Sequence, residues 1–181
     1  MTCIVGWVEN DKICIGGDSA GVAGYDMQIR ADEKVFKNGE MIFGFTSSFR
    51  MGQLLRFSLT LPKKKEEQDD YDYMCTDFIN AVRTCLKSGG YAKVKEGEES
   101  GGCFIVGFRN NLYNIEDDFQ VGRTTKPYHA VGCGESFALG TCLAIEKTNI
   151  KLSLKNKVKL ALESAYEFSA GVRPPYHFVE I

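Results

Sequence analysis

A β-hairpin is predicted by the sequence Met1-Thr-Cys-Ile-Val-Gly-Trp-Val-Glu-Asn-Asp-Lys-Ile-Cys-Ile-Gly-Gly-Asp18. Residues 2–8 and 13–17 are rich in β-branched and other apolar side chains, and the polar segment 9–12 between them is typical of a turn. Because the strands of a hairpin run antiparallel, the end of the second strand should return to the start of the first. Asp18 is therefore expected to lie beside Thr2.

Thr2 is a candidate nucleophile, on the condition that Met1 is removed. An N-terminal threonine carries a hydroxyl and a free α-amine on one residue, so its amine can act as the base for its own hydroxyl. A cation near the hydroxyl, held by a carboxylate, would activate it further, and Lys34 and Asp18 could supply this pair. Taken singly, each residue has an ordinary explanation as a strand residue, a surface lysine or a turn residue. Their joint occurrence in a β-rich segment favours the catalytic interpretation.

The rest of the chain alternates between β-rich and helical segments. Strands are expected near residues 27–31, 34–37, 41–46, 103–108, 112–115, 128–131 and 176–181. Apolar residues at helical spacing predict helices over about 48–61, 74–88, 135–148 and 154–170. The charged run 63–70 and the polar, glycine-rich segment 91–102 are expected to be exposed loops. This order predicts an α+β fold with two packed sheets and helices outside them, in one domain spanning residues 1–181.

Composition narrows the functional classes. A net charge of -2 offers no basic excess for a phosphate backbone, so nucleic acid is an unexpected partner. No apolar run is long enough to span a bilayer and no secretory signal pattern is present, so we expect no membrane association and a cytoplasmic protein. The 7 cysteines include no Cys-x-x-Cys pair, and the 2 histidines lie far apart, so neither disulfides nor a metal or other cofactor is expected.

Two other motifs compete with Thr2 as candidate functional sites. Gly132-Cys-Gly134 follows a predicted strand and precedes a predicted helix, as in dinucleotide-binding loops, but Phe137 stands where the third glycine is required. Cys3 would become a nucleophile only after removal of both preceding residues, and strand alternation places it on the opposite face from Thr2. A core position is the better interpretation of Cys3.

Several segments together resemble the N-terminal-nucleophile peptidases of the proteasome β-subunit class, and among them the HslV peptidases most. They are Met1-Thr-Cys-Ile-Val-Gly6, Gly16-Gly-Asp-Ser-Ala20, Glu33-Lys-Val35, Gly44-Phe-Thr-Ser-Ser48 and Ala130-Val-Gly-Cys-Gly-Glu-Ser-Phe-Ala-Leu139. The resemblance implies a four-layer αββα sandwich of two antiparallel sheets flanked by helices.

The resemblance also implies roles for five residues. Thr2 would be the nucleophile, Lys34 the cation that tunes it, and Asp18 the carboxylate that orients Lys34. The backbone N–H of Ser47 would stabilise the oxyanion, although this turn reads Thr-Ser-Ser where the family has a glycine-rich sequence. Cys133 stands where the family has a serine near the threonine amine, and a thiol is a weaker hydrogen-bonding group.

The resemblance also implies residues that bind substrate or support the catalytic site. Gly21, Asp32 and Phe45 would contribute to substrate binding, and an acid at position 32 would favour a basic side chain before the cut bond. Glu167 and Ser169 near the end of the last helix would support the site.

The function implied is a threonine peptidase that cleaves unfolded proteins or peptides. The family assembles into homo-oligomeric rings and usually works with an ATP-driven unfoldase. Two alternatives remain: a catalytically impaired ring subunit with a structural or binding role, and an amidohydrolase of the same fold that acts on a small amide.

Overall fold

Two antiparallel β-sheets form the centre of the computed structural model, which describes residues 1–181. One sheet has the strand order β12-β1-β2-β13 and the other β11-β10-β9-β6-β5, while β3-β4 and β7-β8 are separate hairpins. The strands are β1 (Cys3–Glu9), β2 (Lys12–Gly17), β3 (Ala20–Ala23), β4 (Asp26–Ile29), β5 (Val35–Asn38), β6 (Met41–Phe45), β7 (Lys93–Lys95), β8 (Glu98–Ser100), β9 (Phe104–Phe108), β10 (Asn111–Ile115), β11 (Val121–Arg123), β12 (Tyr128–Gly132) and β13 (His177–Glu180).

The predicted opening hairpin is confirmed. β1 and β2 pair antiparallel, and the turn residues Asn10 and Asp11 have φ angles of 50° and 58°. Asn and Asp tolerate this left-handed conformation better than most residues, which explains the tight two-residue turn. Thr2 directly precedes β1 and Asp18 directly follows β2, so both lie at the same end of the sheet.

The two sheets pack against each other through branched apolar side chains. Because side chains alternate along a strand, Ile4 of β1 and Ile42 of β6 share this layer while their neighbours in the sequence face the helices. The layer consists of Ile4, Ile13, Ile15, Val35, Ile42, Ile105, Leu112 and Val131. At Gly44 the approach is so close that an added Cβ would lie 2.4 Å from the Ile4 side chain.

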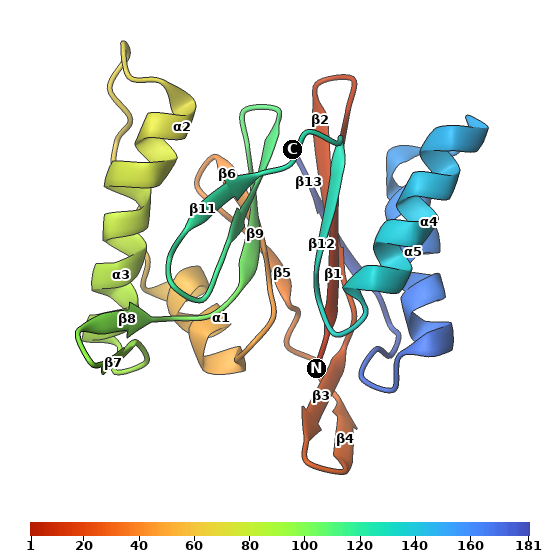
Figure 1. Cartoon of the computed structure of the whole chain (residues 1–181), viewed down its shortest axis with the longest axis horizontal. Coiled ribbons are helices and arrows are strands. Elements are labelled where there is room, and N and C mark those ends of the chain that lie inside the picture. Colours follow the sequence, from red (N-terminus) through yellow and green to blue (C-terminus); the bar gives the residue numbers. More distant parts are fainter.

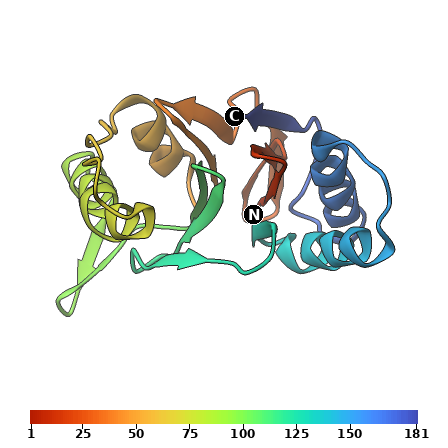
Figure 2. The ribbon, with the colours of Figure 1, turned by 90° about the horizontal axis from the view of Figure 1, so that it is seen from above.

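Helices lie on the outer sides of both sheets (Figures 1 and 2). They are α1 (Phe49–Phe57), α2 (Asp70–Tyr73), the π-helical turn η1 (Met74–Phe78), α3 (Ile79–Ser88), α4 (Glu135–Thr148) and α5 (Leu154–Phe168). Ser48 begins α1 as its N-cap, with its hydroxyl accepting a hydrogen bond from Arg50 N at 3.1 Å. No helix has the length and apolar character that a membrane crossing requires.

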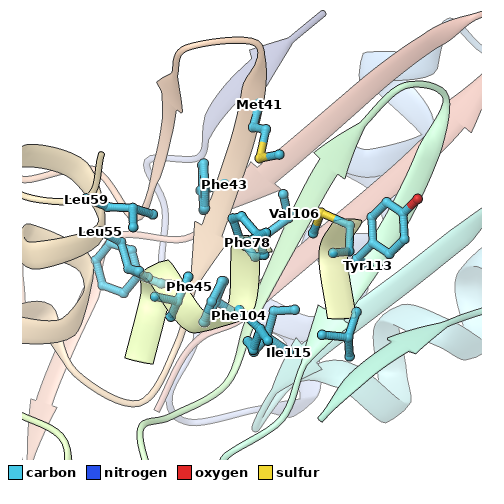
Figure 3. Close-up of a cluster of buried hydrophobic side chains, with 14 of the residues drawn as sticks. Met41, Phe43, Phe45, Leu55, Leu59, Phe78, Phe104, Val106, Tyr113 and Ile115 are labelled. Carbon is cyan, nitrogen blue, oxygen red and sulfur yellow. The ribbon is translucent and has the colours of Figure 1, made fainter. Parts of the chain in front are cut away.

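An aromatic core joins the five-stranded sheet to α1 and to the α2–α3 segment (Figure 3). Phe43 of β6 stacks on Phe36 with ring centroids 5.1 Å apart and lies 6.2 Å from the ring of Phe78 in η1. On the other side of the molecule, alternate residues of β1, including Cys3 and Trp7, pack against α4 and α5. These two cores hold the sheets in place from outside.

Three short elements differ from the sequence-based expectation. Residues 91–102 are not wholly a loop, because β7 and β8 form a small hairpin around Glu96 and Gly97, whose φ angles are 54° and 90°. The small residues after Asp18 form β3, which pairs with β4, and residues 121–123 form the short edge strand β11. Small or charged side chains bury little apolar surface, so these strands depend on pairing with a neighbour that the hydrophobic pattern does not reveal.

We predict that Gly44→Ala destabilises the protein by about 1–3 kcal/mol, because its methyl group must enter the filled space between the sheets. Gly140→Ala is the matched control, since no atom lies within 4 Å of an added Cβ in α4, and it should stabilise by about 0.5–1 kcal/mol. Urea unfolding of both variants measures the difference. Equal stabilities of the two variants would contradict the tight sheet packing.

Candidate active site

A buried ion pair lies at the end of the opening hairpin. Lys34 Nζ donates to Asp18 Oδ1 at 2.8 Å, and the two side chains are 2% and 0% exposed. The Asp18 carboxylate also accepts backbone N–H bonds from Cys3 at 3.0 Å, Ala20 at 2.8 Å and Arg173 at 3.2 Å. Because a buried charge is costly unless it is paired and hydrogen-bonded, these donors compensate Asp18 for lost hydration.

Thr2 completes this arrangement. Its hydroxyl accepts a hydrogen bond from Lys34 Nζ, so Lys34 bridges Thr2 and Asp18. Antiparallel pairing of β1 with β12 brings Thr2 next to Cys133, and Thr2 N lies 3.3 Å from Cys133 Sγ. At Gly132, a Cβ would come within 2.3 Å of the Thr2 carbonyl oxygen, so only glycine fits there.

The pKa of the Lys34 ammonium is lowered from its ordinary value. Burial is the main cause because it penalises the charged form, while the carboxylate of Asp18 opposes the shift. A more acidic ammonium is a stronger hydrogen-bond donor to the Thr2 hydroxyl. The environment of Lys34 therefore favours its use as a donor toward a developing oxyanion on Thr2.

Ser47 lies in the turn between β6 and α1 with an uncommon left-handed conformation, at a φ of 59°. Its hydroxyl accepts a hydrogen bond from Cys103 N at 3.0 Å, which holds the turn against the start of β9. The backbone N–H of Ser47 donates to no backbone acceptor. Non-glycine residues in this region are strained, and such strain is common at functional sites.

A small cavity of about 60 Å³ adjoins Thr2 and Lys34. Its other walls include Val22, Phe45 and Phe49, so it contains Phe45, one of the three residues expected to contact substrate. The rings of Phe45 and Phe49 meet edge to face at 5.8 Å. The lining of this cavity is therefore mixed. Apolar side chains are joined by the hydroxyls of Thr46, Ser47 and Ser48, and Lys34 is the one cation.

Gly21 and Asp32 do not line this cavity. A Cβ at Gly21 would press against the side chain of Arg30, which itself stacks over Phe49 at 4.4 Å. Asp32 is exposed and accepts two hydrogen bonds from Arg30, at 2.9 and 2.8 Å, which lower the pKa of its carboxyl group. Its negative charge is thus already paired within the chain.

The two supporting residues expected near the last helix differ in placement. Ser169 is buried and its hydroxyl lies 3.3 Å from Cys133 Sγ, so it is linked to Thr2 N through Cys133. Glu167 is exposed and makes no hydrogen bond or ion pair with Thr2, Lys34 or Asp18. The structure brings together Thr2, Asp18, Lys34, Ser47 and Cys133, and it leaves Glu167 outside.

The competing motifs fit poorly. β12, which leads into Gly132-Cys-Gly134, pairs antiparallel with β1, whereas a dinucleotide fold needs a parallel βαβ unit. Cys3 is fully buried, and burial raises the pKa of its thiol, which makes it inert. No group of three or more His, Cys, Asp or Glu side chains is placed to hold a metal ion.

Contributors to the site that the sequence did not predict include Val22, Phe49 and Arg173. Phe49 forms part of the cavity wall, and its place directly after the helix-capping Ser48 was the available signal. Arg173 supports Asp18 only through its backbone N–H, so its side-chain type carried no signal at all.

Comparison with known proteins identifies the fold. No protein-family model matches the chain, and no curated protein sequence matches it. Among solved structures, BPH of Thiobacillus denitrificans in complex with epoxomicin superposes with a TM-score of 0.82 at 18% identity, covering 99% of this chain and 97% of that chain. HslV of Trypanosoma brucei gives a TM-score of 0.68 at 14% identity, covering 98% of each chain. Anbu of Hyphomicrobium sp. strain MC1 gives 0.71 at 14% identity, covering 100% of this chain and 82% of that chain.

The chain therefore shares the fold of BPH, HslV and Anbu over nearly its whole length. The expected mixture of helix and sheet is confirmed, but a particular closeness to HslV is not. At such low identities the likeness concerns the fold alone.

We predict strong energetic coupling between Lys34 and Asp18. Lys34→Met should destabilise the protein by about 3–5 kcal/mol, because it leaves a buried carboxylate without its counter-ion. Adding Asp18→Asn removes that unpaired charge, so the double variant should be more stable than the sum of the single effects by at least about 1 kcal/mol. Urea unfolding of the four proteins in the cycle measures this coupling.

The surface pair Lys159 and Glu163, 3.5 Å apart on α5 and about half exposed, provides the control cycle. Lys159→Met and Glu163→Gln should couple by no more than about 0.5 kcal/mol. A coupling as small as this between Lys34 and Asp18 would contradict the importance of the buried pair.

Proposed function

We propose that the protein is a threonine peptidase of the proteasome-related class, with Thr2 as its N-terminal nucleophile once Met1 is removed. The observation that carries this proposal is the buried hydrogen-bonded series of Asp18, Lys34 and the Thr2 hydroxyl. We describe the architecture as a single αββα domain, in which helices flank two sheets. The proteasome-related fold of its neighbours supports this reading.

In the first half of the reaction, Thr2 Oγ attacks the carbonyl carbon of a peptide bond. The hydroxyl proton passes, directly or through a water molecule, to the free α-amine of Thr2, and the carbonyl π electrons move onto oxygen. The Ser47 N–H, which has no backbone acceptor, would donate to this oxyanion. A donor of this kind is worth about 10²–10³ in rate.

In the second half, the tetrahedral intermediate collapses and the carbon–nitrogen bond breaks. The Thr2 ammonium returns its proton to the leaving amine, and the acyl group remains as an ester on Thr2 Oγ. A water molecule then attacks the ester with the same amine as base, releasing the acid and restoring Thr2. Lys34 stabilises negative charge on Oγ in both halves, and Asp18 holds Lys34 in place.

Met1 determines whether this chemistry can occur. While Met1 is attached, Thr2 N is an amide, which cannot act as a base. Met1 also lines the cavity beside Thr2 and Lys34, where the acyl part of a substrate would lie. Removal of Met1 would create the base and enlarge the binding space at once.

The residue before the cut bond would lie in a cavity of mixed lining, in which Val22, Phe45 and Phe49 are accompanied by three hydroxyl-bearing residues and no carboxylate. The basic preference expected from the sequence depends on Asp32, and the Asp32–Arg30 ion pair argues against it because the carboxylate is already paired. Peptides that differ only at this residue would test it.

We also propose a homo-oligomeric assembly that acts on unfolded polypeptide in the cytoplasm with an ATP-driven unfoldase. The helical assembly of the Anbu complex of Pseudomonas aeruginosa, whose subunit fold matches with a TM-score of 0.66, supports assembly. Exposed apolar side chains such as Tyr25, Phe57 and Phe168 would be covered in such an assembly. Light scattering of the purified protein measures its size.

We predict that protein with a free Thr2 hydrolyses an unfolded protein such as casein, whereas the Met1-capped form does not. Methionine aminopeptidase treatment yields the two forms from one preparation, and intact mass reports their ratio. Thr2→Ala in the processed form should lower kcat by about 10³-fold or more, because it keeps the amine and removes the nucleophile.

Unchanged hydrolysis in Thr2→Ala would contradict the peptidase proposal. A processed protein that is inert toward casein but cleaves a small amide would favour the amidohydrolase alternative. A processed protein inert toward both would favour a structural or binding role.

We further predict a graded effect at Cys133, which lies 3.3 Å from Thr2 N. Cys133→Ala removes a polar contact to the amine and should lower kcat by about tenfold, equivalent to the loss of one hydrogen bond. Cys133→Ser retains a hydrogen-bonding group and should stay within about threefold of the wild type. Equal kcat values in all three proteins would exclude a role for Cys133 in positioning the amine.

A further inference from the structure

A second cavity, of about 500 Å³, shares Met1, Thr46 and Ser47 with the small cavity beside Lys34. We call it the acidic cavity, and its polar walls are Cys103, Asn114, Glu116, His129, Cys133 and Glu135. Because the shared residues separate the two spaces, a chain bound across Thr2 would enter one cavity on each side. Loss of Met1 would open the passage between them.

The positions of the two reactive atoms of Thr2 indicate which cavity serves which half of the substrate. Thr2 Oγ1 is held by Lys34, which lines only the small cavity, and Thr2 N lies against Cys133, which lines only the acidic cavity. In the proposed reaction, Thr2 N gives a proton to the leaving amine. The leaving half must therefore lie on the Cys133 side, in the acidic cavity.

The charges of the acidic cavity are of one sign. Glu116 and Glu135 line it, and no lysine or arginine does. Burial lowers the pKa of His129, so this imidazole is mainly neutral at pH 7 and does not offset the two glutamates.

The two glutamates differ in how they are held. Glu116 is half-buried, accepts a hydrogen bond from Asn114 Nδ2 at 2.7 Å and is 3.8 Å from Cys103 Sγ, so its carboxylate has a fixed position. Glu135 is exposed in the first turn of α4 and forms no ion pair within the chain. One fixed and one free acceptor suit a long cationic side chain, which can reach either.

We propose that the acidic cavity binds the residues that follow the cut bond and selects substrates with lysine or arginine there. This inference rests on the proposed peptidase function and adds a substrate class to it. It differs from the expectation for Asp32, because Asp32 concerns the residue before the cut bond and is already paired with Arg30.

The test uses full-length protein with Met1 removed and two kinds of substrate. The first kind is a set of internally quenched peptides that share one acyl half and carry Lys, Gln or Glu as the first residue after the cut. The second is the same acyl half joined to an aminocoumarin, which places no amino acid in the acidic cavity. We compare the wild type, the double variant Glu116→Gln/Glu135→Gln, and the matched control Glu67→Gln, whose exposed side chain lies in the charged run 63–70.

We expect the wild type and Glu67→Gln to prefer Lys over Glu by about tenfold in kcat/KM, which corresponds to charge interactions at a partly exposed site. In Glu116→Gln/Glu135→Gln this ratio should fall to about twofold or less, and the rate with the coumarin substrate serves as the reference to which each protein's peptide rates are normalised. Mass spectrometry of the products confirms the position of the cut.

If the coumarin substrate is hydrolysed but the Lys, Gln and Glu peptides are cleaved at equal rates, the inference about the acidic cavity is wrong and the peptidase function stands. The same holds if the Lys preference survives in the double variant. No hydrolysis of either kind of substrate would overturn both.

Discussion

The buried contact between Lys34 and Asp18 is the interaction on which the site depends. Asp18 can be buried because a cation and three backbone N–H groups surround it, and those groups come from β1, β3 and the segment before β13. Lys34 in turn is held where its ammonium reaches the Thr2 hydroxyl. Parts of the chain far apart in sequence are thus fixed relative to one another by a single carboxylate.

The pairing of the strands links the fold to the proposed chemistry of Thr2. The register of β1 with β2 places Asp18 beside the start of β1, and the register of β1 with β12 places Cys133 beside Thr2. A slip of one residue in either pair would turn Thr2 to the other face and separate it from Lys34. The tight contact of Gly44 with Ile4, in the layer between the sheets, opposes such a slip.

Much of this arrangement could be predicted from the sequence. The rest depends on contacts between distant parts of the chain, which a local sequence pattern does not show. Hairpin geometry alone predicted the approach of Asp18 to Thr2, and the need for a cation near the hydroxyl suggested Lys34. Resemblance added Ser47 and Cys133. Ser47 combines a left-handed conformation with a hydrogen bond from Cys103 N, far along the chain, and no local sequence pattern reveals that contact.

Two other features escaped for similar reasons. Asp32 forms an ion pair with Arg30, whereas the sequence alone suggested that its carboxylate was available to a substrate. The acidic cavity combines β10, β12 and the start of α4, so its one-sided charge is apparent only after folding.

The central claim is that Thr2, once it is the N-terminal residue, is the nucleophile. Epoxomicin, which is bound in the Thiobacillus denitrificans BPH structure, offers a direct probe. Tandem mass spectrometry of processed protein treated with epoxomicin would locate any covalent adduct. We expect one adduct, at Thr2 in the tryptic peptide that spans residues 2–12, and none on the Met1-capped form. An adduct on Cys133 or another residue, or none on the processed protein, would contradict it.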